Sequence, residues 1–321
     1  MTVTQLECFL AIARTRNFGR AADQLGKTQP ALSVQIRRLE TDLGVTLLER
    51  FGRQVRVTGA GEILVPHAER ILADVHESRT RMLEAKGGST GVVRIGVLPT
   101  VAAYFLPAVL STFKARFPEV TIILREESRT ALLIPLIRNS EIDLAFALNA
   151  APSAEIRTRE LLTENLSLAV GRKHPLARKT TVLLSELGKE KFILYKSPLH
   201  STRQLTLEYC HNAGFEPVVE FESEQSETIQ NLVAANLGVT LLPDMVLERR
   251  LGTDLRIVRI LPPAPSRTIV ASWKTGRYLS TVTRRFLQYA EKAGRDWQSG
   301  GSLSPSVLNH SYSDAPTPCA L

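Results

Sequence analysis

The chain has few cysteines and no long hydrophobic run. Its three cysteines, at positions 8, 210 and 319, form neither a disulfide framework nor a zinc-binding cluster, which favours a reducing cytoplasm. The most apolar stretch, residues 92–110, is interrupted by Arg94, Pro99 and Pro107, so it predicts no transmembrane helix. The N-terminus lacks the basic-then-apolar pattern of a signal peptide. We therefore expect a cytoplasmic protein without a membrane partner.

The sequence also lacks the short motifs of common catalytic and metal sites. HExxH and CxxC do not occur, and the six histidines are dispersed. Gly26-Lys27-Thr28 matches the end of a phosphate-binding loop, but Ala21 stands where that loop needs its first glycine. GGSTG at 87–91 fits the letters of GxSxG, yet it follows a helix pattern and precedes a strand pattern, the reverse of a nucleophile elbow. We predict no enzymatic activity, no cofactor and no metal site.

Acidic residues are outnumbered, above all in the first fifth of the chain. The formal net charge is +8 and the isoelectric point is near 9.6, which favours a polyanionic partner. Within residues 1–58, nine Lys and Arg residues stand against five Asp and Glu. A local excess of positive charge is what a phosphate-binding surface requires.

Residues 17–58 have the pattern of a DNA-binding unit. A first short helix pattern ends at Gly26, and Thr28 is placed to cap a second helix with Pro30 in its first turn. Apolar residues at steps of four, three and four define the buried face of the second helix: Leu32, Ile36, Leu39 and Leu43. Polar and basic residues occupy its other faces. Two short helices joined by a tight turn form a helix-turn-helix, whose second helix fits the major groove.

Two further patterns extend this unit. After Gly44 the chain predicts a small hairpin, or wing, that carries Arg50, Arg53 and Arg56. Residues 59–86 predict one long helix, with a seam of small and apolar residues typical of a two-helix coiled coil. The predicted dimer interface consists of Leu64, Ala68, Ile71, Val75 and Met82. The alternatives are an ordinary amphipathic helix pair with solvated arginines, and a long helix that packs on its own C-terminal domain.

From residue 92 onward, apolar strand patterns alternate with helix patterns. This order predicts a mostly parallel α/β sheet covered on both faces. Residues 87–91 predict a flexible hinge. Residues 296–321 are rich in Ser, Pro and Gly and predict a disordered tail.

Three segments carry a resemblance to a known family. LxxFLAIA, NFGRAADQLGKTQPALSVQIRRLETDLGVTLLER and VRVTGAGE resemble the N-terminal domain of the LysR-type transcriptional regulators, and a looser similarity continues to about residue 295. The resemblance implies a winged helix-turn-helix (1–58), a dimerising linker helix (59–86) and a two-lobed α/β effector domain like periplasmic binding proteins (92–295). Lobe one would comprise 92–163 and 267–295, and lobe two 164–266.

The resemblance also implies partners: double-stranded DNA, further copies of the chain in a dimer or tetramer, a small-molecule effector and, for an activator, RNA polymerase. Many family members carry Arg or Lys where this chain has Val34, so we expect Gln29, Ser33 and Arg37 to read bases. The predicted DNA-binding set is Thr28, Gln29, Pro30, Ser33, Gln35, Arg37, Arg38, Arg50 and Arg53.

Ligands of doubly wound sheets bind at the carboxyl ends of strands, near helix N-termini. This rule and the resemblance select the same loops, and the predicted effector-binding set is Thr100, Val101, Ser128, Arg129, Thr130, Phe146, His200, Ser201, Thr202 and Thr240. Hydroxyls with one arginine, Arg129, suit a small anion such as a carboxylate. The alternative for each hydroxyl is a simple helix cap.

The segment around Cys210 resembles the hydrogen-peroxide-sensing member of the family, which uses two cysteines. Cys210 corresponds to the second, and Ser201 stands where the first would be, so a paired thiol switch is absent. We expect a regulator whose effector closes the two lobes and changes how dimers bind operator DNA. The alternatives are a regulator that responds to oxidants through a single thiol, and a small-molecule-binding protein whose N-terminal helices serve assembly only.

Overall fold

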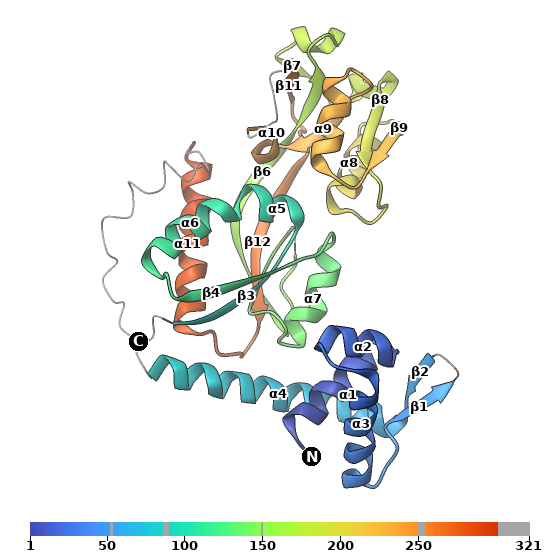
Figure 1. Ribbon diagram of the computed structural model, residues 1–321. Coiled ribbons are helices and arrows are strands. Elements are labelled where there is room, and N and C mark those ends of the chain that lie inside the picture. Colours follow the sequence, from blue (N-terminus) through green and yellow to red (C-terminus); the bar gives the residue numbers. More distant parts are fainter. Residues whose placement is uncertain (52–53, 86–89, 149, 249–253, 301–321) are drawn as a thin grey trace. The chain divides into compact units, whose positions relative to one another are not determined.

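The computed structural model describes residues 1–51, 54–85, 90–148, 150–248 and 254–300 (Figure 1). The chain divides into two compact units, Met1–Lys86 and Gly87–Leu321. Within the described ranges, no helix is long and apolar enough to cross a membrane.

The first unit is a three-helix core with a hairpin and one long helix. Its elements are α1 (Val3–Thr15), α2 (Phe18–Leu25), α3 (Gln29–Leu43), β1 (Leu48–Phe51), β2 (Gln54–Val57) and α4 (Gly59–Ala85). Thr28 caps α3 by accepting the N–H of Ala31 at 3.4 Å, and Gly26 ends α2 with φ 60°. Phe9, Leu32 and Leu39 are fully buried between the helices. The predicted helix-turn-helix and wing are therefore confirmed.

The second unit is an α/β structure. Its first half contains β3 (Gly91–Val97), α5 (Pro99–Tyr104), α6 (Leu106–Arg116), β4 (Val120–Glu126), α7 (Thr130–Arg138), β5 (Leu144–Leu148) and β6 (Ile156–Gly171). Then follow β7 (Thr181–Val182), β8 (Lys191–Tyr195), α8 (Ser201–Asn212), β9 (Val218–Ser223), α9 (Ser226–Ala234), β10 (Thr240–Pro243), α10 (Asp244–Glu248), β11 (Leu255–Ile260), β12 (Ser266–Lys274) and α11 (Thr281–Gln298). Short 3-10 turns cover Pro175–Arg178 and Leu184–Lys189.

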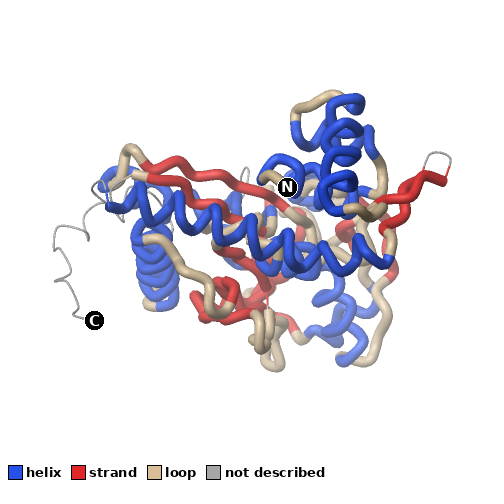
Figure 2. The backbone as a smooth tube through the Cα atoms, turned by 90° about the horizontal axis from the view of Figure 1, so that it is seen from below, coloured by secondary structure: helices blue, strands red, loops and turns tan. Residues whose placement is uncertain are grey.

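The sheet is mixed, which corrects the expectation of a mostly parallel one. Its strand order is β4-β3-β5-β12-β6-β11-β7, with β10 also paired to β6, while β8 and β9 form a separate parallel pair. β12 runs antiparallel to β5 and β6, and β10 and β11 run antiparallel to β6. Figure 2 shows the same backbone from another side, with strands in red and helices in blue. The cause is that the 16-residue strand β6 carries the chain from one lobe to the other and β12 carries it back.

Two hydrophobic clusters support the two lobes. One surrounds β3, β5, α6 and α11, and the other surrounds the far half of β6 with β8 and β11. The helix α11 extends to Gln298, and the side chain of Trp297 packs against the first cluster. The predicted tail therefore begins too early at residue 296, because an apolar contact continues the helix. Cys319 lies outside the described residues.

Candidate functional site

The outward face of α3 carries most of the predicted DNA-reading residues. Gln29, Arg37 and Arg38 are exposed, and Ser33 and Gln35 are half-buried. Gln29, Ser33 and Arg37 follow one another at steps of four residues, so they share one stripe of the helix. Thr28 and Pro30 are also exposed, at the first turn. Val34 is 46% exposed, so an apolar side chain stands among these polar ones.

One wing arginine is held against the recognition helix. The guanidinium of Arg50 donates to Ser33 Oγ at 2.9 Å and lies over the ring of Phe18, 4.1 Å from its centroid. These contacts join β1, α2 and α3, and they occupy one lone pair of the Ser33 hydroxyl. Arg50 therefore positions Ser33 in the DNA-free protein. Arg53 lies outside the described residues.

The predicted seam on α4 is partly used inside the first unit. Ala68 is fully buried in the core of that unit, which corrects its assignment to a dimer interface. Leu64 and Ile71 pack on the same core and are half-buried, as Val75 is, and Met82 is 65% exposed. Ile63, which the seam omitted, is 69% exposed. The other four seam residues stay a prediction.

A buried ion pair lies where the two crossing strands meet. Arg267 of β12 and Glu164 of β6 have side chains that are 0% and 1% exposed, with Nη2 and Oε1 2.7 Å apart. Arg267 Nε donates to the same oxygen at 2.8 Å, and the backbone N–H of Met245 donates to Glu164 Oε2 at 2.9 Å. Burial raises the pKa of Glu164, while Arg267 and the Met245 N–H oppose that rise.

This ion pair reaches the first predicted effector loop. Arg267 Nη1 donates to Thr100 Oγ1 at 3.1 Å, and Thr100 is only 5% exposed. The hydroxyl hydrogen of Thr100 stays available for a further acceptor. His200, a residue of the second lobe, is also close enough to Arg267 for its positive charge to lower the pKa of the imidazole. Thr100 and His200, predicted from separate loops, therefore belong to one polar cluster.

His200 is held neutral in this cluster. Its ring stacks on Tyr195 with centroids 3.8 Å apart, and Nδ1 accepts the N–H of Thr202 at 3.3 Å as the cap of α8. Burial, and secondarily the charge of Arg267, lowers the pKa of His200 to about 4. An imidazole that accepts a hydrogen bond at Nδ1 carries its proton on Nε2.

Beside the ion pair, two buried polar atoms of uncharged side chains form no hydrogen bond of good geometry with a described residue, although Ser226 is close enough to Tyr195 to lower its pKa. They are the hydroxyl of Tyr195 and Oε1 of Gln230, a residue of α9 that is 1% exposed. Tyr104 of α5 lies beside Ser226 and Gln230, and it also influences the pKa of Tyr195. Buried polar groups are nearly always hydrogen-bonded, so unpartnered ones indicate a place for a ligand or an ordered water.

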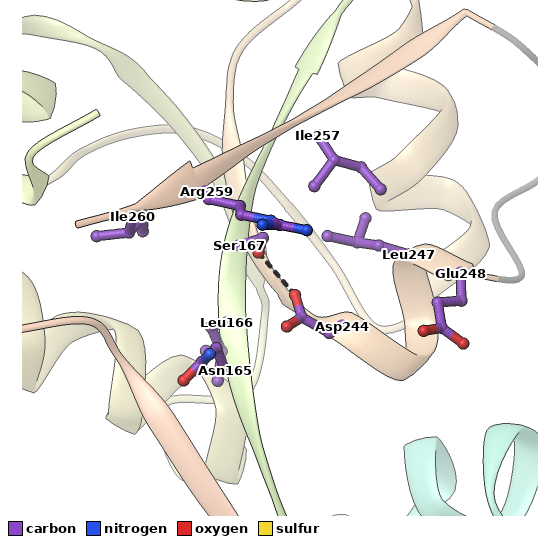
Figure 3. Close-up of a pocket in the computed structure, with 9 residues that line it drawn as sticks. All are labelled: Asn165, Leu166, Ser167, Asp244, Leu247, Glu248, Ile257, Arg259 and Ile260. Carbon is purple, nitrogen blue, oxygen red and sulfur yellow. Dashed lines mark hydrogen bonds between the residues drawn. The ribbon is translucent and has the colours of Figure 1, made fainter. Parts of the chain in front are cut away.

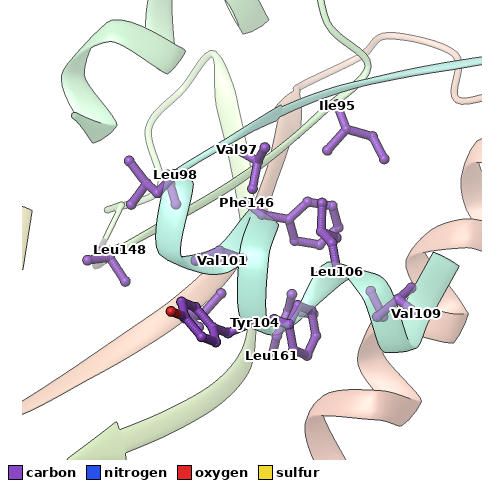
Figure 4. Packing of buried hydrophobic residues seen from close by; sticks show 14 of the residues in the cluster. Ile95, Val97, Leu98, Val101, Tyr104, Leu106, Val109, Phe146, Leu148 and Leu161 are labelled. Carbon is purple, nitrogen blue, oxygen red and sulfur yellow. The ribbon is translucent and has the colours of Figure 1, made fainter. Parts of the chain in front are cut away.

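Several residues of the predicted effector-binding set have structural roles instead. Phe146 is fully buried among apolar side chains such as Val101 and Leu106 (Figure 4). Its ring packs with Phe105 and Phe286, which corrects its assignment to the cleft wall. Val101 is also fully buried in that cluster. Thr130 holds the end of β5, because its hydroxyl bonds both the N–H and the C=O of Leu148.

The remaining predicted residues lie at the loops that were named. Thr202 and Thr240 are both 2% exposed, Thr202 in the first turn of α8 and Thr240 in β10 opposite Ala169. Ser201 begins α8 and is half-buried, Arg129 precedes α7 and is half-buried, and Ser128 is exposed. Among the described residues, Arg129 forms no hydrogen bond or ion pair with the polar cluster.

The sequence reasoning missed Arg267, Glu164, Tyr195 and Gln230. Arg267 and Tyr195 lie at strand ends, Glu164 lies in the middle of β6, and Gln230 lies on the buried face of α9. A charged residue at the edge of a strand that is otherwise apolar, as in RTIVASW, was the one available signal. Arg267 is therefore the fixed positive charge of the site, a role that the sequence assigned to Arg129.

Cys210 is unsuited to thiol chemistry. Its side chain is 0% exposed to solvent and packs in the hydrophobic cluster around β8 in the second lobe. Burial raises the pKa of the Cys210 thiol to about 12. The thiolate is the reactive form, so this cysteine is inert at neutral pH.

Comparison with known proteins agrees with this arrangement. Residues 3–62 match the bacterial regulatory helix-turn-helix proteins of the lysR family, and residues 86–295 match the LysR substrate binding domain. The hydrogen peroxide-inducible genes activator of Haemophilus influenzae is 32% identical over 277 residues, covering 86% of this chain and 91% of that protein. The transcriptional dual regulator GltC of Bacillus subtilis is 36% identical over 291 residues, covering 90% and 96%.

Solved structures show the same two-part architecture. A full-length OxyR variant from Pseudomonas aeruginosa gives a TM-score of 0.69 at 26% identity, covering 92% of this chain and 98% of that one. CbnR in complex with its target DNA gives a TM-score of 0.64 at 25% identity, covering 91% and 100%. These relatives are transcriptional regulators rather than enzymes. The chain therefore belongs to the LysR family of DNA-binding transcriptional regulators, with an effector-binding domain joined to its helix-turn-helix.

Proposed function

We propose that this regulator reads its operator through the stripe of Gln29, Ser33 and Arg37, with Val34 as an apolar neighbour. The supporting observation is that these side chains form one stripe along α3 beside its buried face, with Gln29 and Arg37 exposed and Ser33 half-buried. Gln and Arg match base edges by paired hydrogen bonds, and a small apolar side chain suits the methyl group of thymine. The wing arginines Arg50 and Arg53 bind the phosphate backbone.

Electrophoretic mobility shifts on operator variants test this assignment. Gln29→Ala should relax base preference at one position at a cost of about 1–3 kcal/mol, without changing the salt dependence of binding. Arg53→Ala should weaken binding to all sequences and lower the salt slope by about one unit. Arg79→Ala, an exposed residue of α4, removes the same charge and serves as the control. Equal, sequence-independent losses for Gln29→Ala and Arg53→Ala would contradict the assignment.

We also propose that the effector binds at the polar cluster of Thr100, Tyr195, His200 and Gln230. Thr100 retains a hydrogen to donate, and Tyr195 and Gln230 have buried polar atoms without a partner. Because Glu164 balances the charge of Arg267, an effector needs hydrogen-bonding groups but no negative charge. A small polar metabolite fits these conditions better than the carboxylate expected from Arg129.

An operator-linked reporter tests this site. Thr100→Val should abolish the response to the inducing growth condition while operator binding in vitro keeps the wild-type affinity, because α5 and α3 belong to different units. Several relatives are named for hydrogen peroxide, so peroxide is the natural rival inducer. We expect peroxide to leave the operator footprint unchanged, since Ser201 and the inert Cys210 offer no reactive thiol. A peroxide response that Cys210→Ser abolishes would overturn the metabolite assignment.

The assembly and location follow from the same role. We propose a cytoplasmic dimer or tetramer, because a two-fold pair of recognition helices matches two operator half-sites. As an activator, such an assembly would contact RNA polymerase beside its operator.

A further inference from the structure

A second cavity lies in the effector unit, apart from the polar cluster. It has a volume of about 440 Å³ and lies between β6, α10 and β11 (Figure 3). Its polar lining consists of Asn165, Ser167, Asp244, Glu248 and Arg259. Of the two carboxylates, Glu248 is exposed and already takes part in another interaction. None of Thr100, Tyr195, His200 and Arg267 lines it. Its volume is within the range of small-molecule sites, about 300–1,000 Å³.

The cavity has a negative group that is only partly satisfied. Ser167, which is 4% exposed, donates its hydroxyl to Asp244 Oδ1 at 2.6 Å. Burial raises the pKa of Asp244, and Ser167 and the more distant charge of Arg259 oppose the rise. A neutral hydroxyl leaves the carboxylate without a cationic partner in contact. A carboxylate in this setting attracts an ammonium group, which gains a charge-assisted hydrogen bond.

The cavity also has a positive group. The side chain of Arg259 extends from β11 over the space between Ser167 and Leu247 (Figure 3). Its guanidinium forms no hydrogen bond or ion pair with any residue that the structure describes, Asp244 included, although it is close enough to influence the pKa of Asp244. A guanidinium offers the paired donors that a carboxylate accepts.

An apolar surface separates and flanks these two charges. Leu247 of α10 is 1% exposed, Ile260 is 8% exposed, and Ile257 is 36% exposed beside Arg259 on β11. Leu247 and Ile260 are already buried, so the gain comes from Ile257: an aliphatic chain that covers it removes apolar surface of both partners from water. A carboxylate, a guanidinium and an aliphatic wall around one cavity together specify a ligand with three matching parts.

We propose that this cavity binds an aliphatic α-amino acid. The ammonium group contacts Asp244, the carboxylate contacts Arg259, and the side chain packs on Leu247 and Ile257. The site is separate from the effector cluster, so it gives the regulator a second small-molecule input.

Isothermal titration of the full-length protein with three matched probes tests the proposal. L-leucine carries both charges, 4-methylpentanoate lacks the ammonium, and 3-methylbutylamine lacks the carboxylate. For a ligand of this size and two charged contacts, we expect a Kd of about 1 mM for L-leucine. Each truncated probe should bind at least about tenfold more weakly, because one charged residue is then left without its partner. Absence of saturable heat with L-leucine up to about 20 mM would overturn the proposal.

Variants locate the binding event. Arg259→Met should weaken L-leucine about tenfold and leave 3-methylbutylamine unchanged, and Asp244→Asn should weaken L-leucine while sparing 4-methylpentanoate. The matched control is Arg256→Met on the same strand, since side chains three residues apart point to opposite faces of β11. Equal L-leucine affinity in Arg259→Met and the wild type would overturn the proposal. So would loss of binding in Thr100→Val alone, which would place the amino acid at the polar cluster.

Discussion

The buried pair Arg267–Glu164 should control the stability of the effector unit. The two side chains are 0% and 1% exposed, and their closest atoms are 2.7 Å apart. Removal of one partner leaves the other charge buried without compensation, a cost of about 3–5 kcal/mol. Glu164→Gln keeps the shape and one acceptor but removes the charge. We therefore expect it to lower the free energy of unfolding by about 3 kcal/mol.

A double-mutant cycle separates the pair from its surroundings. Arg267→Met combined with Glu164→Leu removes both charges at similar volume, so the double variant should be more stable than the sum of the single losses predicts, by about 2 kcal/mol or more. Urea unfolding of the full-length protein, followed by the fluorescence of Trp273 and Trp297, measures each loss. The exposed pair Lys191–Glu220, 2.9 Å apart, should show a coupling below about 1 kcal/mol. Additive losses at Arg267 and Glu164 would refute the reasoning.

Four further predictions test other parts of the molecule. The pKa of His200 in the folded protein is about 4, below the ordinary 6.5, so folding favours the neutral ring and stability falls as the pH drops from 6.5 to 4. Between pH 7 and pH 4.5 this effect lowers the free energy of unfolding by up to about 3 kcal/mol. His200→Asn, which keeps a helix cap, should abolish that part of the decrease when urea unfolding is measured at both pH values. Gly294→Ala would place a Cβ 2.2 Å from a carbonyl oxygen of β6 and should cost about 1–3 kcal/mol in thermal unfolding, whereas Gly59→Ala meets nothing and should not. Cys210 should resist iodoacetamide at pH 7 until the protein unfolds, because its pKa is about 12. Ile71→Glu should reduce the mass measured by light scattering, and an unchanged mass would remove Ile71 from the dimer interface.

The first unit was predictable because its signals are local. Gly26 and Gly44 end α2 and α3 with φ of 60° and 69°. Thr28 caps the start of α3 by accepting the N–H of Ala31, three residues further along the chain. Each of these contacts is set by neighbours within one helical turn, so sequence order alone indicates it. The contact between Arg50 and Ser33 spans 17 residues, and no periodic pattern indicates it.

The polar cluster that we propose as the effector site was less predictable because its contacts span the chain. Arg267 reaches Glu164 across 103 residues and Thr100 across 167 residues. The rule that ligands bind at strand ends selected the loop of Thr100 and the cap residue His200, which both lie near Arg267, but it cannot tell which side chains of a strand end point to the core. Phe146 is the example: it lies near the end of β5, but its ring points into the core and packs with Phe105 and Phe286.

The polar cluster and the second cavity are linked through one carboxylate. Glu164 Oε2 accepts the N–H of Met245, the residue after Asp244 in α10, and Glu164 Oε1 holds Arg267, which donates to Thr100. A ligand that shifts α10 therefore changes the position of Glu164, and with it the arginine that orients the Thr100 hydroxyl. Because all these groups are buried, a small displacement has few ways to relax except along β6 and β12, the two strands that join the lobes. The same ion pair that stabilises the crossing strands is thus placed to respond to ligands on both of its sides.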